Sequence, residues 1–166
     1  MSQTVLYGGT FNPIHRGHLE ICLRAREAVG AQEVLLMPAA LPPHKSTGEL
    51  APDRDRLAMC ALAAEPYGFI SVDDYEIRRG GRSYTVDTLR YLTQIRPGEK
   101  FWLLMGTDMF LTFTQWRDWE RIGELATLLV AAREEEDLGR LEAQKAALEK
   151  LGVPSVLLKN APLPMS

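Results

Sequence analysis

The chain has 166 residues, of which 46% are hydrophobic and 25% charged, and its formal net charge is −3 at pH 7. This length and composition predict one globular domain with a substantial core, and the acidic balance argues against a dedicated nucleic-acid surface. No apolar run approaches the ~18 residues of a membrane span, and a strand begins directly after the first three residues, so we expect a cytoplasmic protein without a signal peptide.

The first stretch of the chain predicts a phosphate site. A short apolar strand ends at Gly8 and Gly9, and a helix begins near Gly17. Glycines allow a sharp turn close to a ligand, and the helix start directs unpaired N–H groups and its positive dipole end toward that turn. His15 and His18 flank this helix start, where each ring can donate a hydrogen bond to phosphate and a protonated ring would add charge. The alternative is a tight turn with two ordinary surface histidines.

Residues 8–18, GGTFNPIHRGH, resemble the phosphate-binding signature of the nucleotidyltransferase superfamily. The segment is not a P-loop, because no Gly-Lys-Ser/Thr follows, and it is not a G-x-G-x-x-G dinucleotide turn. Phosphate chemistry is therefore the working hypothesis for the rest of the chain.

Helical and strand patterns alternate from this point on. Hydrophobic spacing and turn residues predict helices over 17–29, 52–65, 83–95 and 137–151, and strands over 33–37, 69–73, 100–105, 125–132 and 156–158. Residues 75–82 are expected to be a polar excursion with a Gly-Gly turn. Cys22 and Cys60 fall on apolar helix faces, which favours buried free thiols over a disulfide. The alternation predicts an α/β fold, a single domain with a doubly wound parallel sheet and right-handed crossovers.

Polar residues follow several of the predicted strands, where open parallel sheets bind ligands. In the loop Pro42-Pro43-His44-Lys45, a cation and an imidazole could lie over a phosphate, or the loop could be a stiff connector with a solvated lysine. Ser83 or Thr85 can cap the helix over 83–95, and the same helix start could offer N–H groups to a carboxylate.

The second half of the chain adds three more candidates. Asp108 follows a strand and can accept from ribose hydroxyls or cap the next turn. Trp116 and Trp119 are three residues apart, so one of them could stack on a ligand ring while the other packs in the core, or both could belong to the core. Arg133 ends a strand, where it suits a phosphate contact or an ion pair with the acidic run 134–137.

Taken together, four segments resemble the bacterial nicotinate-mononucleotide adenylyltransferases over essentially the whole chain. They are residues 8–18, 42–45, 83–89 and 106–108 with Trp116. The resemblance implies a Rossmann-like sheet and a reaction in which ATP and nicotinate mononucleotide give nicotinate adenine dinucleotide and pyrophosphate, with Mg2+ required. The residue roles that it implies fall in two groups: ATP binding by Gly8, Gly9, Thr10, Phe11, His15, His18, Lys45 and Arg133, and mononucleotide binding by Lys45, Tyr84, Thr85, Asp108, Trp116 and Arg117.

The chain departs from that family in two places. Asn12 stands where the family often has Asp, which keeps the hydrogen-bonding shape and loses the charge. The family also carries a second ATP motif, Ile-Ser-Ser-Thr-x-x-Arg, with closing helices near its C-terminus, whereas this sequence stops at Ser166. We expect that motif and those helices to be missing after residue 166.

The expected mechanism is in-line attack of the mononucleotide phosphate on the α-phosphorus of ATP, with His15 and His18 as catalytic donors. Mg2+ is expected to be held by the triphosphate and water, because no carboxylate cluster is evident. The alternatives within enzymes are nicotinamide-mononucleotide, phosphopantetheine and cytidylyl transfer. From another class, the chain could be a catalytically silent nucleotide-binding module, and a tRNA-binding synthetase fragment is disfavoured by the acidic balance.

Overall fold

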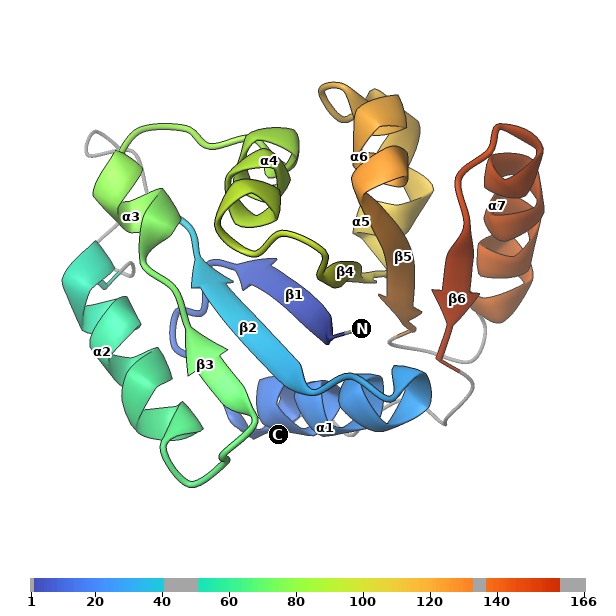
Figure 1. The fold of residues 1–166 in the computed structure, drawn as a ribbon. Helices are drawn as coiled ribbons and strands as arrows, with labels where there is room; N and C mark the ends of the chain where they lie inside the picture. Colours follow the sequence, from blue (N-terminus) through green and yellow to red (C-terminus); the bar gives the residue numbers. More distant parts are fainter. Residues whose placement is uncertain (1, 41–50, 133–136, 159–166) are drawn as a thin grey trace.

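A computed structural model describes residues 2–40, 51–132 and 137–158 (Figure 1). Along the chain, strands and helices alternate almost throughout. The elements are β1 (Gln3–Gly9), α1 (Arg16–Val29), β2 (Glu33–Pro38), α2 (Asp53–Ala64), β3 (Ile70–Val72), α3 (Tyr75–Arg79), α4 (Thr85–Ile95), β4 (Lys100–Gly106), α5 (Thr107–Leu111), η1 (Phe113–Gln115), α6 (Trp119–Leu125), β5 (Ala126–Ala131), α7 (Leu138–Lys150) and β6 (Ser155–Leu157).

The six strands form one parallel sheet in the order β3-β2-β1-β4-β5-β6. The chain winds outward from β1 to β3, returns to place β4 beside β1, and then winds outward again to β6. The order therefore reverses between β1 and β4, and open α/β sheets bind ligands at the carboxyl ends of the strands beside such a reversal. The predicted doubly wound, Rossmann-like fold is confirmed.

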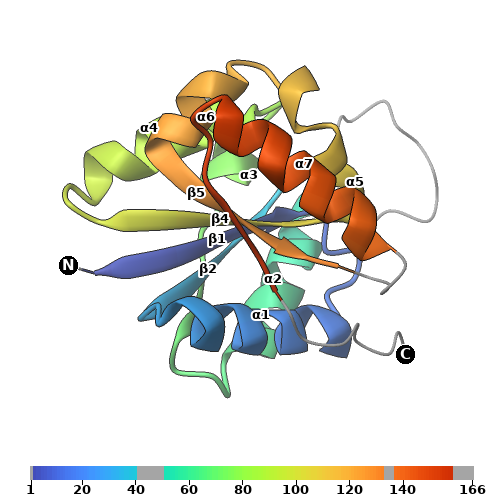
Figure 2. The same ribbon diagram turned by 90° about the vertical axis from the view of Figure 1, so that its right-hand side faces the viewer.

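Helices cover both faces of the sheet because successive strand side chains alternate between faces. Leu6, Leu35 and Leu103 pack into a core with α4, α5, α6 and α7, whereas Val5 and Leu104 pack on the opposite face with α1 and α2. Figure 2 shows this division, with α1 and α2 below the sheet and α4 to α7 above it. Strands buried on both faces explain the continuous apolar runs in the sequence.

Several short helices were not predicted, α3 and α6 among them. Residues 75–79 form α3, where an excursion was expected, and residues 119–125 form α6 directly before β5. Both helices are held by aromatic or apolar contacts made across the fold: Tyr75 stacks on Tyr91 with ring centroids 3.8 Å apart, and Ile122 is fully buried. Tertiary packing of this kind overrides weak local propensity in elements this short.

The start of α4 also differs from the prediction. Tyr84, rather than Ser83 or Thr85, is the N-cap residue. Within the described residues, this helix start has no capping hydrogen bond from a side chain. The two cysteines behave as predicted, since Cys22 and Cys60 are both buried and free. None of the helices within the described ranges is long and apolar enough to cross a membrane.

Candidate functional site

A pocket of about 410 Å³ opens at the carboxyl ends of the central strands, where the strand order reverses. Its floor comes from the ends of the strands, with Gly8 and Gly9 of β1 and Met37 of β2. Its walls come from later elements, with Thr85 at the start of α4 and Trp116 after η1. The sheet topology therefore brings the first glycine turn to the same hollow as two residues that the sequence places far along the chain.

A second pocket, of about 490 Å³, adjoins the first, because Ser83, Thr85 and Trp116 line both. Tyr84 and Arg117 complete it together with residues that include Arg82. We refer to these two adjoining pockets, which extend from the β1 turn to the start of α4, as the hollow.

His15 and His18 fix the start of α1 by capping it reciprocally. Nδ1 of His15 accepts a hydrogen bond from the Gly17 N–H at 3.0 Å, and Nδ1 of His18 accepts from the His15 N–H at 3.0 Å. The N–H groups of His18 and Leu19 bond to the His15 carbonyl at 3.0 and 3.3 Å. The expectation that this helix start offers unpaired N–H groups is therefore corrected, because bonds within the turn already occupy these four.

The same bonds set the tautomer of both rings. A ring nitrogen that accepts from a backbone N–H carries no proton, so each neutral imidazole carries its proton on Nε2. The two rings lie against each other with centroids 3.8 Å apart and planes 32° apart. His15 and His18 therefore present two neighbouring Nε2–H donors at the positive end of a 14-residue helix.

The His18 ring is held neutral, so it does not add the charge that a protonated ring would carry. Burial of the imidazole, followed by the nearby His15, lowers the pKa of His18 from 6.5 to about 4. Protonation would also place a hydrogen on Nδ1 and break its bond with the His15 N–H. Near neutral pH the His18 ring is consequently neutral, and its Nε2–H remains a donor.

Gly17 is needed for this arrangement, although the sequence suggested only that it begins the helix. A Cβ at Gly17 would lie 2.9 Å from Cε1 of His15 and 3.1 Å from Nδ1. Any larger residue would therefore displace the His15 ring from its capping position. The His-x-Gly-His spacing carried this information, since the glycine lies two residues after His15 and directly before His18.

The ring of Phe11 packs against His18. It is 3% exposed and meets the His18 ring edge-on, with centroids 5.2 Å apart. A Cβ at Gly9 would lie 3.3 Å from the same ring, so Gly9 leaves room for it. Because the ring is buried, any contact of Phe11 with a nucleotide would be made by its backbone.

A buried arginine, Arg56 of α2, fastens the loop between β1 and α1. Its side chain is 0% exposed, and Nη1 donates to the Thr10 carbonyl at 2.7 Å, Nε donates to the Ala51 carbonyl at 3.2 Å, and Nη2 pairs with Asp53. The Ala51 N–H donates in turn to Oδ1 of Asn12 at 3.0 Å. Asn12, which stands where the family often has Asp, thus retains an acceptor oxygen that holds the loop beside the start of α2.

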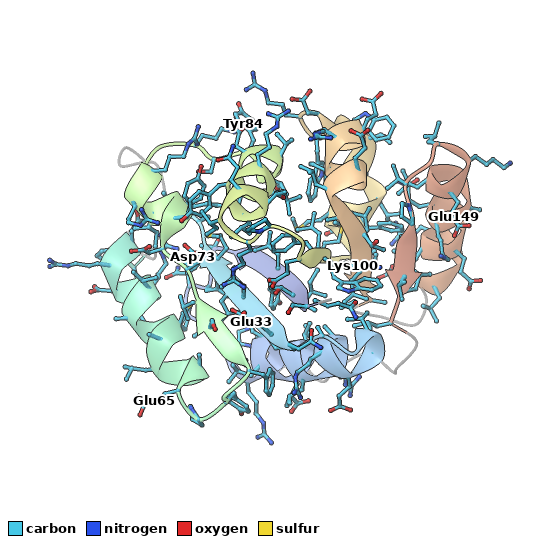
Figure 3. The ribbon with its side chains drawn as sticks, in the orientation of Figure 1. Glu33, Glu65, Asp73, Tyr84, Lys100 and Glu149 are labelled. Carbon is cyan, nitrogen blue, oxygen red and sulfur yellow. The ribbon has the colours of Figure 1, made fainter. Side chains whose placement is uncertain are left out.

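Aromatic and cationic side chains gather around the second pocket. Figure 3 shows Tyr84 beside α4, in the helical layer above the sheet. The guanidinium of Arg117 lies 4.5 Å from the Tyr84 ring centroid, and that of Arg82 lies 5.2 Å from it. Trp116 and Trp119 both pack on the buried Phe113, but only Trp116 lines the two pockets. Of the two indoles, Trp116 is therefore the one placed to stack on a ligand.

The remaining predicted residues are less closely tied to the pockets. Asp108 is exposed in the first turn of α5, and its neighbour Met109 lines the first pocket. Lys45 and Arg133 lie outside the described residues, so their phosphate contacts stay predictions. Within the described ranges, no three His, Cys, Asp or Glu side chains are grouped closely enough to hold a metal ion.

Comparison with known sequences places the chain among nucleotidyl-transferring proteins. A family profile described as cytidylyltransferase-like matches residues 6–162. A protein of Marinobacter nauticus called "probable nicotinate-nucleotide adenylyltransferase" is 41% identical over 92% of this chain and 72% of its own length. Proteins of the same name from Shewanella pealeana and Trichlorobacter lovleyi are 37% and 46% identical, over 96% and 78% of this chain. The chain spans 71% of the former and 61% of the latter.

Solved structures agree on the fold. The nicotinic acid mononucleotide adenylyltransferase of Plasmodium falciparum, complexed with NaAD, aligns with a TM-score of 0.71 and 17% identity over 100% of this chain and 77% of that chain. The same protein complexed with APC aligns with a TM-score of 0.65 and 15% identity, with the same coverage. At these identities the likeness concerns the arrangement of strands and helices.

Arg56→Met should lower the free energy of unfolding by about 3 kcal/mol, because it leaves the Thr10 and Ala51 carbonyls without their charged donor. Urea denaturation measures this loss. Arg54→Met, an exposed arginine on the same helix, is the control and should stay within ~0.5 kcal/mol of the wild type. Equal stability of the two variants would contradict the anchoring role of Arg56.

NMR titration should place the midpoint of the His18 imidazole near pH 4 rather than near 6.5. At pH 7, ¹⁵N shifts should show Nδ1 of both capping histidines unprotonated and Nε2 protonated. Because folding disfavours the charged ring, the contribution of His18 to the free energy of unfolding is complete above pH 6.5 and is lost as the pH falls toward 4. The signal of His18 is the one that disappears in His18→Gln. A midpoint near pH 6.5 would refute the neutral state of this ring at pH 7.

Proposed function

The chain belongs to the nicotinate-nucleotide adenylyltransferase family within the cytidylyltransferase-like proteins, and from this premise we propose that it transfers the adenylyl group of ATP to nicotinate mononucleotide. The products are nicotinate adenine dinucleotide, a step of NAD biosynthesis, and pyrophosphate. The observation that carries the proposal is the pair of adjoining pockets between the β1 turn and the start of α4. The β1 turn at one end leads along the chain to the two histidine donors, and the other end has an aromatic and cationic lining.

In the proposed reaction, a phosphate oxygen of the mononucleotide attacks the α-phosphorus of ATP. A new P–O bond forms, the bond from the α-phosphorus to the bridging oxygen breaks, and pyrophosphate leaves with the electron pair. The attacking phosphate is already an anion, so the chain need not supply a general base. Its residues contribute positioning and stabilisation of charge on the transferring group.

His15 and His18 are proposed as the donors to that charge. Their Nε2–H groups are held in place by the backbone, so they need little reorganisation as charge develops. The dipole of α1 acts in the same direction, and no acidic residue in its first turn offsets it. Gly8, Gly9 and Thr10 would follow the phosphates along the β1 turn, and Lys45 and Arg133 keep their predicted phosphate roles.

The mononucleotide is proposed to occupy the part of the hollow near α4. Trp116 would stack on the pyridine ring, and the carboxylate would lie toward Tyr84, Thr85 and Arg117. Asp108 would accept from ribose hydroxyls. Two guanidinium groups on the Tyr84 ring favour a negatively charged carboxylate over the neutral amide of nicotinamide mononucleotide.

Mg2+ is proposed to accompany the triphosphate. When bound, the ion neutralises charge on the phosphate oxygens and favours departure of pyrophosphate. The described residues fit an ion held mainly by phosphate and water, because no three of their His, Cys, Asp or Glu side chains are grouped to form a cage.

The test of this function is pyrophosphate release from ATP and Mg2+ with the acid and the amide mononucleotide side by side. We expect kcat/KM at least tenfold higher with the acid, the scale of one charge-assisted hydrogen bond. Arg117→Met should lower the rate with the acid and leave the rate with the amide within about twofold. A faster reaction with the amide, or activity with neither acceptor, would contradict the proposal.

Two substitutions of His18 distinguish its role in capping α1 from its proposed role as a hydrogen-bond donor to phosphate. His18→Ala should lower both the free energy of unfolding, by about 1 kcal/mol, and turnover, by about 10²-fold. His18→Gln keeps an acceptor at the third helical position, as in a capping box, so its stability should remain near the wild type while turnover still falls about 10²-fold. Thermal unfolding and steady-state kinetics measure both. Near-normal turnover in His18→Gln would restrict His18 to capping.

A further inference from the structure

The hollow contains one acidic side chain, Glu76, that neither the nucleotide roles nor the sequence patterns account for. Glu76 belongs to α3 and lines the first pocket together with Gly8, Thr85 and Trp116. Its neighbours in this pocket are the proposed sites of two anions, the phosphate groups and the nicotinate carboxylate. A carboxylate there would repel both, so its presence calls for a part of the ligand with hydrogen-bond donors.

Contacts between α3 and α4 hold Glu76 in place. Oγ1 of Thr88, on α4, donates to Oε2 of Glu76 at 2.7 Å, and Thr88 is 1% exposed. One residue earlier, Tyr75 stacks on Tyr91 of α4 with planes 9° apart. The Tyr75 N–H donates to Asp73 at the end of β3, and Figure 3 shows Asp73 at this edge of the sheet. Glu76 is therefore fixed relative to α4 before any ligand arrives.

Within the described residues, Glu76 forms a hydrogen bond through one of its two oxygens. Oε2 has the Thr88 hydroxyl, whereas Oε1 has no hydrogen-bond partner in the parts of the chain that the structure describes. Burial raises the pKa of the Glu76 carboxyl, and the Thr88 hydrogen bond and Arg79 oppose this shift. A hydroxyl is a suitable partner for such a group, because it can donate to an ionised carboxyl and accept from a protonated one.

We propose that Oε1 of Glu76 binds a ribose hydroxyl of the nicotinate mononucleotide, so that Glu76 is a specificity-determining residue for the acceptor. This inference rests on the proposed function. The mononucleotide has an anion at each end, its carboxylate and its phosphate, and a ribose with two hydroxyl groups between them. Glu76 lines the pocket between the β1 turn and Thr85, so the ribose is the part of the ligand that matches it.

The experiment compares nicotinate mononucleotide with its 2′-deoxy and 3′-deoxy analogues in the wild type and in Glu76→Ala. The wild type should prefer the ribonucleotide over one of the analogues by about 10- to 100-fold in kcat/KM, as expected for a charge-assisted hydrogen bond. Glu76→Ala should raise KM for the ribonucleotide by a similar factor and reduce the preference below about threefold. Its KM for ATP should stay within about twofold of the wild type.

Two further variants distinguish a loss of ligand binding from a loss of folding stability. Glu76→Gln is isosteric and retains an acceptor for Thr88, and it should lose about tenfold in kcat/KM with the ribonucleotide at unchanged thermal stability. Glu65→Gln is the matched control, because Glu65 is exposed at the end of α2, away from the pocket (Figure 3). It should match the wild type with every acceptor.

Each other outcome would overturn the inference. An equal loss of kcat/KM with ribo and deoxy acceptors would assign Glu76 to the α3–α4 contact alone. A changed preference for ATP over 2′-deoxy-ATP, with the acceptor preference intact, would place the ribose of ATP at this residue instead. Wild-type activity without any ribose preference would refute the role of Glu76 and leave the proposed function standing, whereas a wild type inactive with all acceptors would refute the proposed function itself.

Discussion

The site depends on the reciprocal capping of α1 by two histidines. A helix start leaves backbone N–H groups unpaired, and here the Nδ1 atoms of His15 and His18 accept two of them. This arrangement determines the tautomer, the ring orientation and the direction of both Nε2–H groups at once. The proposed binding surface that results is made of side-chain donors whose rings are fixed by backbone hydrogen bonds before a ligand binds.

Other contacts hold the loop and the two histidine rings in place. Arg56 and Ala51 hold the loop between β1 and α1 from the side of α2, and the buried Phe11 ring lies against His18. Gly17 completes the arrangement by leaving space for the His15 ring. The loop thus has few conformations to lose on binding, and preorganised donors of this kind are the usual source of electrostatic stabilisation of a transferring phosphoryl group. Arg56, Phe11 and Gly17 therefore act through the positions of the loop and of the two histidine rings.

The end of the hollow near α4, where we propose that the acceptor binds, follows from the sheet topology. Because β4 returns to lie beside β1, the starts of α4 and of the segment after η1 come to the carboxyl edge where the β1 turn lies. Charge is distributed unevenly there, with guanidinium groups at Tyr84 and a carboxyl group at Glu76. A ligand with an anion at each end and hydroxyl groups between them matches this distribution, which links the proposed acceptor to the inferred role of Glu76.

The sequence by itself determined the fold class and the two ends of the site. Continuous apolar runs alternating with helical patterns are enough to predict a doubly wound parallel sheet, and the spacing of Gly8, Gly9, His15 and His18 is local, so the sequence alone could predict a phosphate site there. The sequence did not predict α3 or α6, because Tyr75 and Ile122 are stabilised by contacts across the fold that local propensity does not encode. It could not show that His18 is neutral, that Arg56 is buried against Thr10, or that Glu76 lines the first pocket. Desolvation and long-range hydrogen bonds decide these properties, and they exist only once segments distant in the chain are packed together.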